Sequence, residues 1–316
     1  MYASFNGICM INKIKNSIKQ TVFHAALLFF ARAPASKNTD TAVASLLCHR
    51  DVSMYIYAVL SLFQAINTTL PLYIVDDGTL TTSDKRLLTK YFSVTIISRE
   101  RLTSLAQGIL SKYPHIRAFL YSPEAPVIKW KLLLKLVCPY DHFIIYDADI
   151  LFFRKSPEIR RWVENPDTLL HLEYEPRERT RKHTDDECYL DLYHSYRQLL
   201  VHSSAPGANP LFNTGLVCIP DKSLFELPTM NRLLGILKKT YFDNQFGSDE
   251  VIVGSVIAKE ERTPLPKKRY VIQFDTIRRA HQDIICLHYC WRAKALFQLD
   301  AIRLAVHTRG FRFHHT

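Results

Sequence analysis

The sequence predicts an α/β protein built on a parallel sheet that helices cover on both faces. Apolar runs of strand length alternate with segments of helical period in short units. The run at 142–153 is apolar on both sides of its acidic residues, which is typical of a strand buried on both faces. A length of 316 residues is enough for one large domain of this class with a sizeable core.

The first part of the predicted domain supplies strands that each lead into a helical stretch. Asp51 or Ser53 is placed to cap the first helix, and a Thr/Ser start marks the second. The predicted strands are 42–49, 70–78, 93–98 and 142–153, and the predicted helices are 51–67, 81–92 and 125–137. Short units of this kind place the carboxyl ends of neighbouring parallel strands at one sheet edge, where ligands bind.

The second part of the chain is less regular. The segment 175–187 is strongly charged and has no apolar period, so we expect a mobile loop there. The remaining expected helices are 156–165, 223–242 and 248–260, and the remaining expected strands are 168–174, 211–220, 269–274 and 284–291. Neither an internal repeat nor a clear linker divides this part, so the sequence predicts one domain over residues 41–300.

Charge and cysteine content narrow the class of protein. The net charge of +11 suits an anionic substrate or an anionic membrane surface. The basic residues are spread out and no recognition helix stands out, so a nucleic-acid partner is not expected. The seven cysteines are scattered, which favours a reducing compartment and a cytoplasmic location. Cys286-x-His288-x-Cys290 has the spacing of one strand face and lacks a second ligand pair, so it predicts buried strand residues rather than zinc ligands.

The chain ends lie outside the predicted domain. The apolar stretch 21–33 follows Lys13, Lys15 and Lys19, and it is shorter than the roughly 20 residues that a spanning helix needs. We expect residues 1–40 to form an amphipathic helical extension that either packs on the domain or makes peripheral contact with a membrane surface. Residues 301–316 are expected to form a basic tail.

Two acids interrupt the most apolar strand. Asp147 and Asp149 lie between apolar runs, and within a strand their side chains would point the same way with Cα atoms ~7 Å apart. Like charges this close repel, so the pair is expected either to meet Arg or Lys or to hold a divalent cation. Hard oxygen ligands suit Mg²⁺ or Mn²⁺. Because the two glycine-rich phosphate loops are absent, such a cation would also neutralise a diphosphate.

Four segments in this order resemble the nucleotide-sugar-dependent glycosyltransferases of the GT-A fold. They are YDADILFF, FNTGLVCIP, GSDEVIVGSVIA and LHYCW, and the earlier LPLYIVDDGTLT accompanies the first of them. The resemblance covers roughly residues 41–295 and implies a Rossmann-like α/β fold whose sheet is mixed and mostly parallel. It also implies a metal-dependent glycosyltransferase, with a hexosyltransferase as the expected type.

The resemblance implies a metal site. In this family the second acid of the D-x-D motif binds the metal and the first binds metal or ribose, which corresponds to Asp149 and Asp147. A late histidine often completes the shell, and His288 matches it. Mn²⁺ or Mg²⁺ is the implied cofactor, acting as a Lewis acid on the diphosphate of the donor.

The resemblance also implies the residues that bind the nucleotide. The family recognises base and ribose with the ends of the first two strands, which here carry His49 and Arg50 after Cys48, and Asp76 and Asp77. The donor is expected to be a UDP-sugar, with GDP left open.

The helix that precedes the D-x-D strand carries a further candidate. Related proteins often place a basic residue here toward the donor, and Lys131 lies at this place. Lys129 and Lys135 share the helix, so a solvated basic face is the alternative.

The sugar and acceptor residues follow from the last two motifs. Asn213 is placed to bond sugar hydroxyls with both a donor and an acceptor group. Asp249 and Glu250 are the acidic candidates for catalysis, although either could serve only to cap a helix. In an inverting enzyme one of them would be the general base, and in a retaining enzyme it would position substrate or shield positive charge. The acceptor hydroxyl could belong to a carbohydrate, lipid or protein.

Rival functions have weaker support. A catalytically degenerate relative that only binds carbohydrate or acts as a scaffold keeps the same fold and remains the alternative. An aspartyl phosphatase would place the D-x-D motif on its first strand with Thr or Val two residues on, where this chain has Leu151.

Overall fold

The computed structural model describes most of the predicted domain and two short pieces before it. The described residues are 21–23, 25–27, 32–35, 40–121, 129–174, 212–236, 248–257, 261–276 and 283–308. For Ser248, Asp249 and Val251 only the backbone is described. The charged loop expected at 175–187 and the end of the basic tail, 309–316, lie outside this part of the chain.

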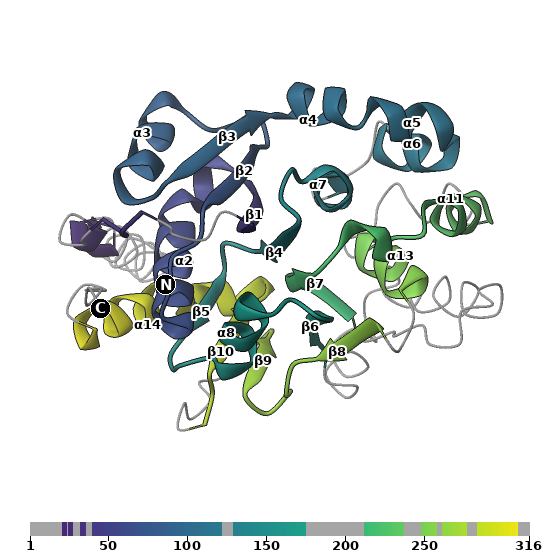
Figure 1. Cartoon of the computed structure of the whole chain (residues 1–316). Coiled ribbons are helices and arrows are strands. Elements are labelled where there is room, and N and C mark those ends of the chain that lie inside the picture. The colour runs from purple at the N-terminus through teal and green to yellow at the C-terminus, as the bar shows by residue number, and fades with distance from the viewer. Residues whose placement is uncertain are drawn as a thin grey trace, which may run out of the picture.

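A seven-stranded sheet forms the centre of the molecule, in the order β3-β2-β1-β4-β7-β6-β8 (Figure 1). Its strands are β1 (Thr41–Leu47), β2 (Leu72–Asp76), β3 (Val94–Ser98), β4 (His142–Tyr146), β6 (Leu169–Glu173), β7 (Phe212–Ile219) and β8 (Arg262–Pro264). The first four pair in parallel, β7 is antiparallel to β4 and β6, and β8 is parallel to β6. The predicted mixed, mostly parallel sheet is confirmed.

The strand order reverses at β1. The chain adds β2 and then β3 on one side of β1, and it returns to place β4 on the other side. Thr41 lies beside His142 and Ala44 beside Ile145 in this parallel pair. Because the crevice at such a reversal lies outside the carboxyl ends of the strands, the residues that follow β1, β2 and β4 face a common space.

A second, three-stranded sheet carries the remaining strands in the order β5-β10-β9. Its strands are β5 (Ile150–Phe152), β9 (Tyr270–Gln273) and β10 (Cys286–Tyr289). In the register of this sheet His288 lies opposite Ile150. The residue that follows Asp149 is therefore paired with the predicted late histidine.

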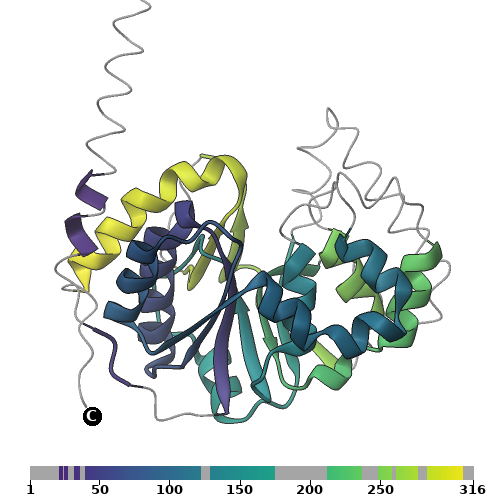
Figure 2. The same ribbon diagram turned by 90° about the horizontal axis from the view of Figure 1, so that it is seen from above.

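Helices cover both faces of the central sheet, as Figure 2 shows from above. One face is packed by α2 (Val52–Ile66), α3 (Thr82–Tyr91), α8 (Pro157–Glu164) and α14 (Lys294–His307), and the other by α4 (Arg99–Leu105), α5 (Gln107–Lys112), α6 (Pro114–Tyr121), α7 (Trp130–Val137), α11 (Leu227–Ile236) and α13 (Ser248–Val256). The alternation of side chains along β4 divides the core. Ile144 and Tyr146 join the first apolar cluster, and Phe143 and Ile145 join the second.

The first two helices begin as their sequences suggest, with one difference. Thr81 caps α3 in a capping box, in which its side chain accepts from the amide of Asp84 and the Asp84 carboxylate accepts in return. Asp51 occupies the N-cap position of α2, but its side chain makes no capping bond. It accepts instead from Cys48 Sγ and Arg50 Nε.

The strand predicted over 142–153 is wrong as a single strand. β4 ends at Tyr146, residues 147–149 form a turn, and β5 starts at Ile150 in the other sheet. The apolar runs on either side are both genuine strands, so hydrophobicity alone shows no break between them. The break gives Asp147 and Asp149 a place at the joint of two sheets instead of on one strand face.

The amino-terminal segment packs on the domain where it is described. Phe23 and Leu27 are buried, and the Phe23 ring stacks on Tyr57 with centroids 4.5 Å apart. Tyr57 Oη donates to the carbonyl oxygen of Phe23 at 2.9 Å, and Tyr91 Oη donates to that of Leu27 at 2.5 Å. No helix among the described residues is both long and apolar enough to traverse a bilayer. At the other end, α14 runs across residue 300, which the sequence marked as the limit of the domain.

Candidate metal and ligand site

Three side chains converge where the two sheets meet. The carboxylates of Asp147 and Asp149 and the imidazole of His288 each offer one ligand atom, and these atoms lie within 4.8 Å of one another. His288 Nε2 is 3.2 Å from Asp149 Oδ1 and 3.8 Å from Asp147 Oδ2. The structure thus brings together the three residues that the sequence nominates as metal ligands.

Backbone bonds fix this convergence. The amide of Asp147 donates to the carbonyl of Gly215 on β7 at 2.8 Å, and the amide of Tyr289 donates to the carbonyl of Asp149 at 2.8 Å. Each aspartate is thereby tied to a different strand, β7 for Asp147 and β10 for Asp149. The turn between β4 and β5 is held from both sides, which fixes the spacing of the two carboxylates.

A lysine contacts each of the two carboxylates. Lys131 on α7 forms an ion pair with Asp147 Oδ1, and Lys294 Nζ lies 2.8 Å from Asp149 Oδ2. Each aspartate therefore directs one oxygen to a lysine and the other toward His288. The sequence allowed the acids to meet basic residues or to hold a cation, and this arrangement has room for both roles.

The ion pairs and the histidine shift the acid–base behaviour of the site. Burial opposes ionisation of Asp149, but the neighbouring His288 and Lys294 outweigh it and lower the pKa of the carboxyl. Burial likewise opposes protonation of His288, yet Cys290 and Asp149 raise the pKa of its imidazole well above the ordinary value. Asp149 is therefore an anion at neutral pH, which is the form that binds a cation.

Gly215 makes room for the histidine. A Cβ on this residue would lie 2.3 Å from His288 Cε1 and 2.7 Å from His288 Nδ1. Both distances are far shorter than any real contact, so only glycine lets the imidazole sit against β7. The glycine of the FNTG motif thus has a packing reason that is specific to the site.

Next to the acids, Asn213 and Glu250 form a polar network with Tyr174. Asn213 Nδ2 donates to Glu250 Oε1 at 2.9 Å, and Tyr174 Oη lies 3.0 Å from each oxygen of the same carboxylate. The amide of Thr214 donates to Glu250 Oε1 at 3.2 Å. Asn213 Oδ1 accepts from the Gly215 amide at 3.0 Å, which links the network to the glycine beneath His288.

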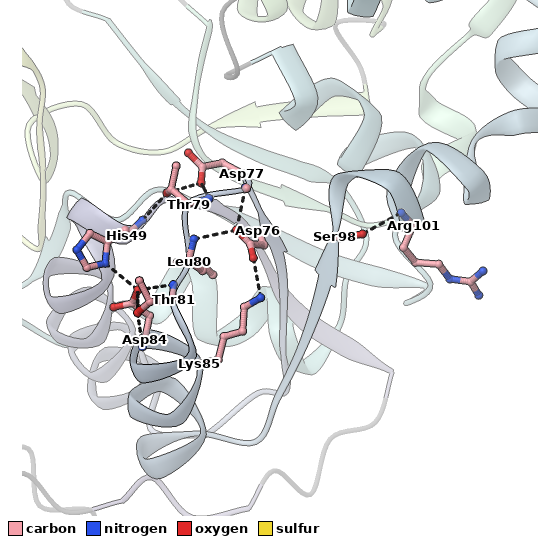
Figure 3. A network of polar contacts seen from close by, with 11 residues as sticks. His49, Asp76, Asp77, Thr79, Leu80, Thr81, Asp84, Lys85, Ser98 and Arg101 are labelled. Carbon is pink, nitrogen blue, oxygen red and sulfur yellow. Dashed lines mark hydrogen bonds and ion pairs between the residues drawn. The ribbon is translucent and has the colours of Figure 1, made fainter.

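The loop between β2 and α3 carries the predicted nucleotide residues (Figure 3). Asp76 accepts from the amides of Gly78 and Leu80 and pairs with Lys85 at 2.8 Å, so both of its oxygens organise the loop. Asp77 Oδ1 accepts from the amide and the hydroxyl of Thr79, and the Asp77 amide donates to Leu47 at the end of β1.

The end of β1 joins the same loop. His49 Nδ1 lies 2.7 Å from Asp84 Oδ2, and the His49 amide donates to Thr79 Oγ1 at 2.9 Å (Figure 3). Arg50 is exposed and contacts Asp51. His49, Arg50 and Asp77 thus lie on adjoining strand ends, whereas Asp76 is buried in a structural role.

The lysines of α7 do not form a solvated face. Lys129, Lys131 and Lys135 are all buried, and Lys129 Nζ lies 4.6 Å from the centre of the Phe119 ring. The alternative of an exposed basic face is therefore wrong, and Lys131 points at the D-x-D acids. Of the two catalytic candidates, Asp249 lies on α13 but its side chain is outside the described part of the chain.

Two residues of the site were missed in the sequence. Lys294 lies three residues after Trp291 in LHYCW, and a single lysine at the start of a helix carries no distinctive pattern. Tyr174 directly follows β6, and aromatic residues are common in and beside strands for packing alone.

Comparison with known proteins supports the fold. No protein-family model and no curated protein matches the sequence. Among solved structures, the chain is similar to the apo WbbM bifunctional glycosyltransferase, with a TM-score of 0.54 and 12% identity over 86% of this chain. It spans 50% of that protein.

Two further structures are similar at lower scores. The galactosyltransferase LgtC, in complex with donor and acceptor sugar analogues, gives a TM-score of 0.49 at 14% identity over 86% of this chain and 100% of that chain. Mouse xyloside xylosyltransferase 1 in its apo form gives 0.47 at 13% identity over 79% and 98%. The sheet order and the match to WbbM together show that the chain has a Rossmann-like fold of the GT-A type.

Proposed function

We propose that the protein is a metal-dependent glycosyltransferase that moves a sugar from a nucleotide-diphosphate sugar to an acceptor hydroxyl. The observation that carries this proposal is the convergence of Asp147, Asp149 and His288 at the reversal of the strand order. A UDP-sugar is the donor that we propose, with a hexose as the transferred group. The acceptor class is a carbohydrate, a lipid or a protein.

The three side chains suit a divalent cation of the Mn²⁺ or Mg²⁺ type. Two carboxylate oxygens are hard ligands and one imidazole nitrogen is a borderline ligand. Because Gly215 has no Cβ, the imidazole of His288 has room to lie next to the acids. When bound, the cation would neutralise charge on the diphosphate of the departing nucleotide. Asp147, Asp149 and His288 would hold it.

The lysines give the site a balanced charge. Lys131 and Lys294 neutralise Asp147 and Asp149 in pairs, so these four side chains together carry no net charge. His288 binds a cation only as the neutral imidazole, so it gives up its proton when the cation binds and then adds no charge. A divalent cation would leave an excess of two positive charges, and the diphosphate of a nucleotide sugar carries two negative ones. The cation and the diphosphate therefore suit this site together better than either does alone.

The sugar would lie beside the network of Asn213, Tyr174 and Glu250. The Glu250 carboxylate receives hydrogen bonds from three groups, which hold it in one orientation. A carboxylate held in this way is better suited to binding a sugar hydroxyl, or to shielding positive charge on the sugar, than to taking a proton. Asp249 stays a candidate for acceptor activation, and His49, Arg50 and Asp77 stay candidates for nucleotide contact.

One observation favours the alternative of a degenerate glycosyltransferase that only binds carbohydrate or acts as a scaffold. The ion pairs of Lys131 and Lys294 satisfy the D-x-D acids without any cation. A protein that had lost metal binding could keep the same arrangement as a purely structural one. Metal-dependent nucleotide binding separates the two functions.

The test measures UDP and GDP binding by calorimetry with Mn²⁺, with Mg²⁺ and with EDTA, followed by a panel of nucleotide sugars for hydrolysis. Asp149→Asn keeps the shape of the side chain and removes its charge, so we expect it to abolish turnover and metal-dependent nucleotide binding. Glu158→Gln is the matched control, because Glu158 is also ion-paired, with Arg269, but at the opposite end of the three-stranded sheet. A nucleotide affinity that is the same with Mn²⁺, with Mg²⁺ and with EDTA would contradict the proposed metal-dependent enzyme and favour the scaffold function.

A further inference from the structure

Trp291 combines an exposed indole with an unusual backbone. Its φ is +53°, a value that bulky residues rarely adopt, and its side chain is 63% exposed. Of the three tryptophans in the sequence, Trp162 is buried and Trp130 is partly buried. A protein tolerates a left-handed tryptophan only where its surroundings hold it, and such residues cluster at functional sites.

The turn that carries Trp291 is anchored to the site on both sides. Before it, the Tyr289 amide donates to the carbonyl of Asp149 and the Cys290 amide donates to that of Gln273, each at 2.8 Å. After it, Lys294 contacts Asp149 at 2.8 Å. The left-handed residue reverses the chain between β10 and α14, so the indole stands at the apex of a turn whose two arms reach the D-x-D acids.

A glycine or an asparagine would suit this backbone with less strain. The tryptophan therefore contributes something that the turn itself does not require. A large, flat and rigid apolar surface at the rim of a polar site binds a flat apolar face at low entropic cost. The face of a pyranose ring, which presents C–H groups, has this shape.

We propose that Trp291 is the stacking platform for the acceptor sugar, and hence that the acceptor is a carbohydrate. The proposal rests on the proposed function and adds the acceptor class to it. Trp291 follows β10, whose His288 lies against Gly215, next to the Asn213 that bonds Glu250 in the sugar network. The nucleotide candidates lie instead at the ends of β1 and β2. The acceptor must also enter from solvent, where the indole is exposed.

The experiment uses two variants of the full chain. Trp291→Asn removes the indole but keeps a residue that accepts a left-handed backbone, and Trp291→Phe keeps an aromatic face. Saturation-transfer NMR is recorded with the methyl glycosides of glucose, galactose, mannose, N-acetylglucosamine and xylose, in the presence of UDP and Mn²⁺. We expect at least one glycoside to bind the wild type, to bind about tenfold more weakly to Trp291→Asn, and to bind Trp291→Phe nearly as well.

Calorimetry of UDP with Mn²⁺ on the same proteins separates this proposal from the proposed function. We expect equal UDP affinity in all three, with melting temperatures of the variants no lower than that of the wild type as evidence of folding. Glycoside binding that survives in Trp291→Asn, or a wild type that binds UDP but no glycoside, would overturn the stacking role alone. A loss of UDP affinity in Trp291→Asn would assign the indole to the nucleotide instead. Failure of the wild type to bind UDP with Mn²⁺ would overturn the proposed function itself.

Discussion

Gly215 is the position at which the site can least accommodate an added side chain. It lies on β7 beneath the His288 ring, and it also supplies the carbonyl that receives the Asp147 amide. One residue thus positions two of the three candidate ligands, one through its backbone and one through its missing side chain. Mutations here test the geometry of the site without removing any charged group.

We expect Gly215→Ala to weaken UDP binding in the presence of Mn²⁺ by at least about tenfold, because the new methyl group must displace the imidazole. The overpacking should also lower the free energy of unfolding by about 1–3 kcal/mol. Calorimetry and urea denaturation measure the two effects. Gly108→Ala is the matched control: it has open space around it and lies in α5, so alanine should be neutral or stabilise by up to about 1 kcal/mol. Equal UDP affinity in both variants would show that His288 has no part in the site.

The sequence predicted those site residues whose type is unusual for the segment in which they lie. Two aspartates between apolar runs demand an explanation, and Asp147, Asp149 and His288 do meet in space. Lys294 could not be found in this way, because a lysine beside a helix start is common. Its importance comes only from the pairing of β10 with β5, which no local pattern encodes.

At the scale of elements, β4 and β5 show where periodicity reaches its limit. Both strands are apolar and buried, so the sequence predicts one long strand where the structure has two in different sheets. Element type was right for most of the chain because the helices have a clear apolar stripe and recognisable starts, as at Thr81. Which strand joins which sheet depends on long-range pairing, and therefore lay beyond what local pattern predicts.

The strand β6 carries a buried histidine that should make folding stability depend on pH. His171 is fully buried against Phe212, with ring centroids 4.6 Å apart, and among the described residues its Nε2 has no hydrogen-bond partner. Burial lowers the pKa of His171 to about 4 from an ordinary value of 6.5. The unfolded chain therefore takes up a proton at a higher pH than the folded one does.

The free energy of unfolding is unaffected by His171 above about pH 6.5, where the histidine is neutral in both states. It decreases as the pH falls from there toward about 4, because the unfolded chain takes up the proton first. The total loss over this window is about 3 kcal/mol, from about 1.4 kcal/mol per pKa unit. We expect His171→Phe, which keeps a ring against Phe212, to flatten the dependence of unfolding free energy on pH between 7 and 5 by about 2 kcal/mol. Denaturant titrations at several pH values measure this slope, and an unchanged slope would mean that His171 is not buried in its neutral form.

At the scale of the whole molecule, the reversal of strand order decides where chemistry can occur. It gathers the ends of β1, β2 and β4 at one edge, and β10 adds His288 from the second sheet. The net charge of +11 belongs to the whole chain, and it favours the approach of an anionic donor to the molecule. The alternation of strands and helices predicted this edge, although it did not predict the second sheet that completes it.

Charge balance at this edge should couple the binding of cation and nucleotide. Because the acids are already neutralised by Lys131 and Lys294, we expect Mn²⁺ alone and UDP alone to bind weakly. Each should raise the affinity of the other by roughly 5–150-fold, the usual range of coupling between two sites. Titrations of each ligand with and without its partner measure the two factors, which must be equal by linkage. Independent binding would mean that the lysines do not balance the site.

The turn at residues 147–149 bridges two separate sheets, with Asp147 tethered to β7 and Asp149 to β10. An ion held by both carboxylates would cross-link the two sheets at this turn. Any sliding of the small sheet against the large one would change the separation of the carboxylates, so loading the ion would stiffen the molecule as a whole. Substitutions between the two sheets, even far from the ligands, would then change catalysis by changing the separation of the two carboxylates.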